Sequence, residues 1–189
     1  MTSPVLHYIH DPLCGWCYGA APLVRAAREV LPVLHHGGGM MAGANRQPIT
    51  PQLRAYVLPH DQRIAQLTGQ VFGDAYRDGL LQDGKAVMDS EPPITAILAA
   101  EQLAAGRGLD MLARLQEAHY QRGRQIADPG VLADEAEALG LDRGAFNAAY
   151  AACSGTATQT HMNQSRALLR DRKSTRLNSS HGYISYAVF

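Results

Sequence analysis

The chain has 189 residues, about the size of one domain or of one domain with an insertion. Its 17 basic and 17 acidic residues balance. This argues against a nucleic-acid partner or an anionic membrane surface, because both are negatively charged and bind proteins with an excess of basic residues. No apolar run of about eighteen residues is present, and the start of the chain lacks the features of a secretory signal. We therefore expect no membrane partner and a cytoplasmic location, where thiols are normally reduced.

The beginning of the chain predicts a strand, a helix and a second strand. Residues 5–10 are a β-leaning run that ends at Pro12, since proline cannot continue a hydrogen-bonded ladder. Residues 15–30 carry apolar side chains at helical spacing, and residues 33–36 can form the second strand before the three glycines at 37–39. Such a unit predicts a βαβ crossover of the right-handed kind.

The middle of the chain, from about residue 50 to 170, predicts helix after helix. Several of the starts carry a capping residue, a following proline, or both. These starts are Thr50-Pro51, Ser90 or Glu91 before Pro92, Asp128-Pro129, and Asp142. The last helix is expected from about Gln159 to Arg172.

The tail, residues 173–189, differs in composition from the rest. It holds four serines, as many as residues 1–172 together, and one of the two lysines of the chain. We interpret it as a non-native extension of the kind produced by sequencing-adaptor read-through; a final strand over residues 183–189 is the alternative. The tail is therefore excluded from the prediction of the fold.

Two cysteines, Cys14 and Cys17, flank Gly15 and Trp16 at the predicted strand–helix junction. A helix that begins at Cys14 points its unpaired N–H groups and the positive end of its dipole at the first sulfur. We expect this to lower the pKa of the Cys14 thiol and to leave its sulfur at the surface. Cys14 would then attack a disulfide as a thiolate, and Cys17, one turn along, would resolve the mixed disulfide.

Other interpretations of the cysteines are weaker. A zinc site needs a second cysteine pair or spaced histidines, whereas Cys153 stands alone and His35 and His36 are adjacent. A purely structural disulfide is disfavoured by the expected cytoplasmic location. Cys153 is expected to be a buried small apolar residue. We predict no metal site and no bound cofactor.

The residues next to the Cys14–Cys17 motif can be interpreted in two ways. Trp16 either shields the pair and contacts a substrate or simply packs. His10 would favour a thiolate if it were protonated, and Asp11 would oppose it; the alternative is that both are polar groups at the strand end, exposed to water. His119, Tyr120 and His161 are expected to be ordinary helix-face residues.

Four segments of the chain resemble the DsbA-like branch of the thioredoxin superfamily, and within it the cytoplasmic proteins described as predicted protein-disulfide isomerases. They are DPLCGWCYGAAP, HHGGGMMAG, DSEPPITAILAAE and AHYQRGRQIAD, and the resemblance runs from about Val5 to Arg170. It implies an α/β fold, in which a thioredoxin-like βαβ core is interrupted by a large all-helical insertion. It also implies that Cys14 is the nucleophile and Cys17 the resolving thiol.

The family fold continues after the insertion with two antiparallel strands and a helix. A cis-proline opens the first of these strands beside the active-site sulfurs, but this sequence holds no proline after Pro129. We therefore expect a C-terminally truncated chain that lacks the antiparallel half of the core. The expected division is a βαβ half at 1–48, a helical insertion at 49–172 and the tail at 173–189.

The predicted function is that of a thiol–disulfide oxidoreductase or protein-disulfide isomerase that acts on protein or small-molecule thiols and disulfides. Glutathione is a candidate redox partner. The active-site set comprises Cys14 and Cys17 as catalytic residues, with Gly15, Trp16, His10 and Pro12 as neighbours. One alternative is a glutathione-dependent isomerase or transferase like the kappa-class relatives, which use a single serine. The other is a helical interaction module or an inactive fragment.

Overall fold

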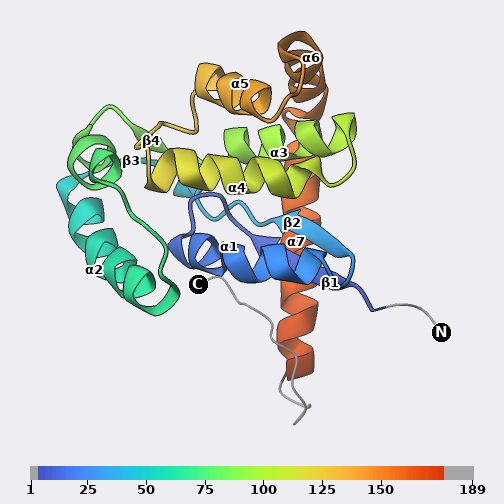
Figure 1. Cartoon of the computed structure of the whole chain (residues 1–189), viewed down its shortest axis with the longest axis horizontal. Helices are drawn as coiled ribbons and strands as arrows, with labels where there is room; N and C mark the ends of the chain where they lie inside the picture. The colour runs from blue at the N-terminus through green and yellow to red at the C-terminus, as the bar shows by residue number, and fades with distance from the viewer. Residues whose placement is uncertain (1–3, 177–189) are drawn as a thin grey trace.

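A strand–helix–strand unit forms the N-terminal part of the molecule. In the computed structural model, which describes residues 4–176 and the last five of these by backbone alone, β1 (Leu6–His10) pairs in parallel with β2 (Val33–Gly37). Helix α1 (Gly15–Arg28) connects the two strands (Figure 1). The predicted βαβ unit is confirmed. No other strand of the described residues adjoins this sheet.

Helices make up most of the remaining chain, as predicted. A second, two-stranded antiparallel sheet, which the sequence did not indicate, pairs β3 (Gln47–Pro48) with β4 (Val87–Met88). Short turns η1 (Gly43–Asn45), η2 (Ala75–Gly79) and η3 (Leu80–Gln82) lie between the longer elements. The longer helices are α2 (Pro51–Thr68), α3 (Glu91–Leu103), α4 (Arg107–Tyr120), α5 (Pro129–Ala138), α6 (Arg143–Cys153) and α7 (Thr156–Arg176).

Side-chain caps begin three of these helices where the sequence predicted them. Thr50 accepts a hydrogen bond from the Leu53 N–H at 3.1 Å, and Asp142 accepts one from Ala145 at 2.8 Å. Asp128 likewise caps α5. Ser90 precedes α3 but makes no capping hydrogen bond, because its hydroxyl donates to the carboxylate of Asp11 instead. Caps of this kind satisfy N–H groups that the first turn of a helix leaves unpaired.

Helix α7 is longer than predicted at both ends, running from Thr156 to Arg176. It packs against β2, where Arg166 donates hydrogen bonds to the carbonyl oxygens of Gly38 and Gly39, both at 2.7 Å. Gly39, two residues after the end of β2, has a φ of +69°, which explains why glycine occupies this turn. The first four residues of the expected tail thus belong to a helix, and the predicted alternative strand at 183–189 lies outside the described residues.

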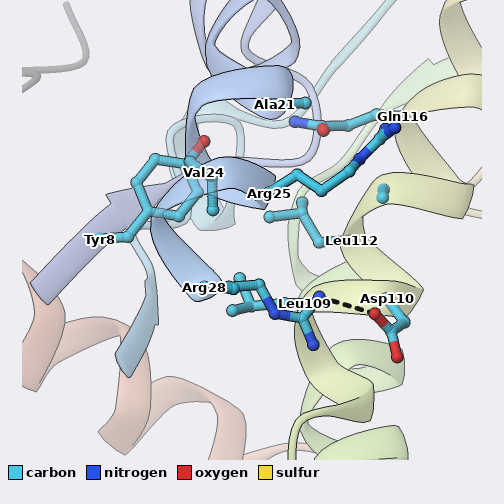
Figure 2. A pocket seen from close by; sticks show the side chains of 10 residues that line it. Tyr8, Ala21, Val24, Arg25, Arg28, Leu109, Asp110, Leu112 and Gln116 are labelled. Atoms are coloured by element: carbon cyan, nitrogen blue, oxygen red, sulfur yellow. Dashed lines mark hydrogen bonds and ion pairs between the residues drawn. The ribbon is translucent and has the colours of Figure 1, made fainter. Parts of the chain in front are cut away.

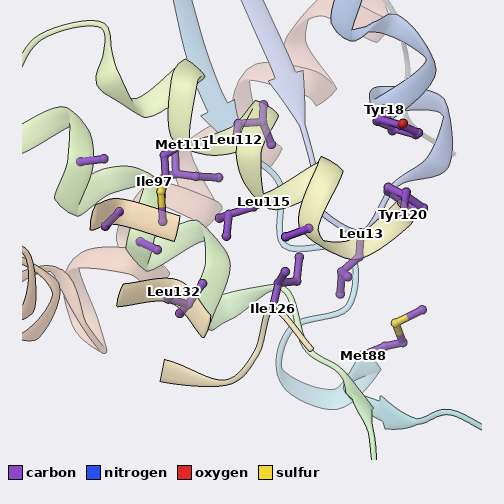
Figure 3. Close-up of a cluster of buried hydrophobic side chains, with 14 of the residues drawn as sticks. Leu13, Tyr18, Met88, Ile97, Met111, Leu112, Leu115, Tyr120, Ile126 and Leu132 are labelled. Atoms are coloured by element: carbon purple, nitrogen blue, oxygen red, sulfur yellow. The ribbon is translucent and has the colours of Figure 1, made fainter. Parts of the chain in front are cut away.

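The hydrophobic core joins the βαβ unit to the helices. Figure 3 shows side chains from α1, α3, α4 and α5 meeting in one cluster, among them Tyr18, Ile97, Leu115 and Leu132. Each of these four side chains is buried. The arrangement is the α/β fold that the resemblance implied, a βαβ core with a large helical part. None of the helices in the described part of the chain is long and apolar enough to span a membrane.

Candidate active site

Cys14 is the N-cap residue of α1. Its backbone is extended, and its sulfur accepts a hydrogen bond from the Cys17 N–H at 3.3 Å. The sulfur therefore takes the position that a serine or aspartate oxygen usually occupies at a helix start, where N–H groups and the helix dipole favour an anion. The residue is only 4% exposed, which corrects the expectation of a surface sulfur.

The two thiols of the pair differ in their electrostatics. A hydrogen bond from the Cys17 side chain, together with the backbone N–H groups of Cys17 and Trp16, lowers the pKa of Cys14 against the opposing effect of burial. Burial raises the pKa of Cys17 well above its ordinary value, and the bond to Cys14 and the charge of Cys14 add to this. When the pair loses one proton, the negative charge therefore resides on Cys14.

Asp11, expected at the solvent-exposed end of the strand, is 1% exposed. Its carboxylate accepts hydrogen bonds from Leu13 N at 2.9 Å, Met40 N at 2.6 Å and the Ser90 hydroxyl at 2.9 Å. Burial raises the pKa of Asp11 against these hydrogen bonds, and its negative charge opposes a thiolate at Cys14. Asp11 therefore fastens the loop before α1 to the loop after β2 and to α3.

His10 is also buried, at 1% exposure, which corrects its predicted exposure to water. Burial lowers the pKa of His10 well below its ordinary value, so the imidazole is neutral at pH 7. Its ring lies 5.3 Å from that of Tyr8 and 5.7 Å from that of His35, measured between ring centroids. His10 therefore supplies no positive charge to the thiolate.

Helix α2 packs directly on Gly15, the first of the two residues between the cysteines. A Cβ on Gly15 would lie 2.9 Å from Ile64 Cδ1 and 3.1 Å from Asp61 Oδ1, so a larger residue here would force these two side chains to shift. Asp61 is buried, and its other carboxylate oxygen accepts a hydrogen bond from the Tyr76 hydroxyl at 2.9 Å. Burial raises the pKa of Asp61 to about 6. No local pattern in the sequence points to Asp61, because it lies inside a helix 46 positions beyond Gly15.

Aromatic side chains line the inner side of the pair. Tyr8 donates a hydrogen bond from its hydroxyl to the Cys17 carbonyl oxygen at 3.3 Å. Tyr18 stacks on Tyr120 with 4.9 Å between ring centroids, and Tyr120 lies near enough to both cysteines for their charges to raise its pKa, after the larger effect of burial. Tyr120 and His119 are thus core residues rather than ordinary helix-face residues.

The outer side of the pair carries Trp16, which is 44% exposed. The structure thus presents an apolar surface next to the first cysteine, while Pro12 is buried in the loop before it. Cys153 is 9% exposed and donates a hydrogen bond from its sulfur to Gln102 Oε1 at 3.1 Å, which confirms its predicted burial. In the described part of the chain, no three His, Cys, Asp or Glu side chains are arranged to hold a metal ion.

Comparison with known proteins gives matches among solved structures. No protein-family model matches the chain, and neither does any curated protein. The chain is similar to the cytosolic disulfide reductase DsbM from Pseudomonas aeruginosa in a structure with glutathione, at 52% identity and a TM-score of 0.84. That match covers 90% of this chain and 82% of DsbM.

Two further structures agree with this match. A second structure of DsbM gives 53% identity and a TM-score of 0.84 over 90% of this chain and 80% of the other. A protein described as a disulfide isomerase from Nitrosomonas europaea gives 24% identity and a TM-score of 0.75 over 91% and 80%, which supports the fold. The chain therefore belongs to the DsbA-like branch of the thioredoxin superfamily and is a thiol–disulfide oxidoreductase.

Proposed function

We propose that the chain is a cytoplasmic disulfide reductase in which Cys14 is the nucleophile, Cys17 is the resolving thiol and glutathione supplies the electrons. The observation that carries the proposal is the opposite displacement of the two thiol pKa values, down for Cys14 and up for Cys17. A thiolate at Cys14 can attack the substrate disulfide, while a protonated Cys17 stays unreactive until the mixed disulfide has formed.

The proposed reaction moves two electrons from the pair to the substrate. The Cys14 thiolate attacks one sulfur of the substrate disulfide, and the other sulfur leaves as a thiolate that takes up a proton. Cys17 loses its proton and attacks the Cys14 sulfur, which releases the second substrate thiol and leaves a Cys14–Cys17 disulfide. Two glutathione molecules then reduce this disulfide in two exchanges and depart as oxidised glutathione.

The recessed sulfur favours a slender substrate. Cys14 is 4% exposed, so a disulfide in an extended peptide reaches it more readily than one on a flat folded surface. Trp16 offers an apolar contact beside the sulfur. The glutathione in one DsbM structure, a tripeptide, is consistent with this preference.

Glutathione-coupled reduction of a small mixed disulfide tests the proposal. Cys14→Ala should abolish turnover, whereas Cys17→Ala should accumulate the protein with one glutathionyl group on Cys14, as detected by mass spectrometry. Cys153→Ala is the matched control and should turn over like the original chain, because this sulfur contacts Gln102 and neither of the other cysteines. Full activity of Cys14→Ala would rule out the proposed nucleophile.

A further inference from the structure

A cleft between α1 and α4 lies outside the cysteine pair. Its volume is about 150 Å³, and neither cysteine lines it. Figure 2 shows its wall formed by side chains of α1 and α4, with Tyr8 of β1 at the inner side. A cavity of about this volume holds a molecule the size of benzene, so the space suits about six non-hydrogen atoms. Glutathione is too large to enter it whole.

Gln116 gives the cleft an unsatisfied hydrogen-bond donor. The residue is 1% exposed, and its Nε2 has no hydrogen-bond partner. Leaving a buried amide donor without a partner costs about 1–3 kcal/mol. In this structure Nε2 is closed to solvent, so the Gln116 amide must turn toward the cleft before an acceptor on a bound molecule can remove this cost.

The charges that line the cleft sum to an excess of positive charge. Arg28 is neutralised by Asp110 at 2.7 Å. Arg25 is exposed and forms no side-chain hydrogen bond or ion pair with any residue that the structure describes. In Figure 2, Arg25 and Gln116 lie at one end of the cleft and the Arg28–Asp110 pair at the other. An anionic group is therefore favoured at the end that holds Arg25.

The rest of the lining is apolar and includes Val24, Leu109 and Leu112. An inorganic anion would leave these side chains without a partner, whereas a short hydrocarbon chain would cover them. We propose that this cleft is a binding site for a small monocarboxylate, with its carboxylate between Arg25 and Gln116 and its apolar stem along α4. The site is independent of the proposed redox reaction, although Tyr8 connects it to the Cys17 carbonyl.

Calorimetric titration of the reduced chain with butyrate tests this inference, with butyramide and inorganic phosphate as comparison ligands. Butyrate should bind saturably, and both comparison ligands should bind at least about tenfold more weakly. Arg25→Gln and Gln116→Leu should each weaken butyrate binding by about tenfold or more. Arg63→Gln is the matched control, because Arg63 is exposed on α2 and forms no side-chain contact of this kind with the described residues.

Three results would overturn the inference. They are the absence of saturable butyrate binding, equal binding of butyramide or phosphate, and an Arg25→Gln variant that binds butyrate as tightly as Arg63→Gln. Since Arg25 lies on the surface, its variant keeps the test valid even where Gln116→Leu fails to fold. Binding is measured directly, so the outcome does not depend on disulfide turnover.

Discussion

Buried carboxylates occur in two regions of this molecule, and they differ in whether charged side chains pair with them. Between α4, α5 and α6, Glu135 is nearly fully buried and lies against three arginines, Arg114, Arg122 and Arg124, at 2.7 to 3.1 Å. Burial acts to raise the pKa of Glu135, but the hydrogen bonds from these arginines outweigh it and the pKa is lowered.

Around the cysteine pair, Asp11 and Asp61 are buried without an ion pair to any described residue. They accept hydrogen bonds from neutral groups only, and burial raises the pKa of both. The helical region thus neutralises its buried charge, and removing the carboxylate there would leave the arginines without a partner. Around the cysteines, burial shifts both carboxyl groups toward the protonated form, as is common near a site where ionisation is part of the chemistry.

Asp61→Asn should give the largest change that follows from this comparison. Because the pKa of Asp61 is raised to about 6, the protonated carboxyl stabilises the fold at low pH, and this contribution is lost as the pH rises from the ordinary aspartate pKa through 6. The neutral amide avoids this loss. Relative to the original chain, the variant should gain about 2.5 kcal/mol in the free energy of unfolding between pH 4 and pH 8.

Urea denaturation at a series of pH values measures this gain. Asp78→Asn is the control, because the Asp78 side chain is 64% exposed. Its stability relative to the original chain should stay constant within a few tenths of a kcal/mol. A flat profile for Asp61→Asn would show that Asp61 is ionised in the fold without penalty, and the comparison would fail.

Glu135→Gln should have the opposite sign and a smaller size. It leaves three arginines facing an amide, and the free energy of unfolding should fall by about 2 kcal/mol at pH 7, since the arginines remain partly hydrated. Because the pKa of Glu135 is lowered, its contribution is present above the ordinary glutamate pKa and is lost as the pH falls through the lowered value.

The difference between Glu135→Gln and the original chain should therefore shrink on acidification, as followed by the same denaturation series. Glu137→Gln is a suitable control, since the Glu137 side chain is 47% exposed and, among the residues that the structure describes, forms an ion pair with a single arginine, Arg143. If Glu135→Gln were neutral at pH 7, the arginine cluster would contribute nothing to stability.

The sequence predicts the local parts of this structure well. The βαβ unit and the caps Thr50, Asp128 and Asp142 depend on residues a few positions apart, and the structure bears them out. It does not predict the environment of the cysteines. Ser90 reaches Asp11 across 79 positions, which no local pattern indicates.

The wrong expectations have the same physical origin. His10 and Asp11 were expected in water because they end a strand, and Cys14 was expected at the surface because it begins a helix. In the fold, the helical region covers all three. Packing between distant segments decided these environments, and packing of this kind leaves no periodicity in the sequence.

The central claim is that Cys14 carries the charge of the pair because Cys17 donates a hydrogen bond to it. The direct test is the pH dependence of Cys14 alkylation by iodoacetamide in the original chain and in Cys17→Ala. We predict a Cys14 pKa below the ordinary thiol value in the original chain and a higher pKa in the variant, which lacks the side-chain hydrogen bond from Cys17. An ordinary pKa for Cys14 in both proteins would contradict the account.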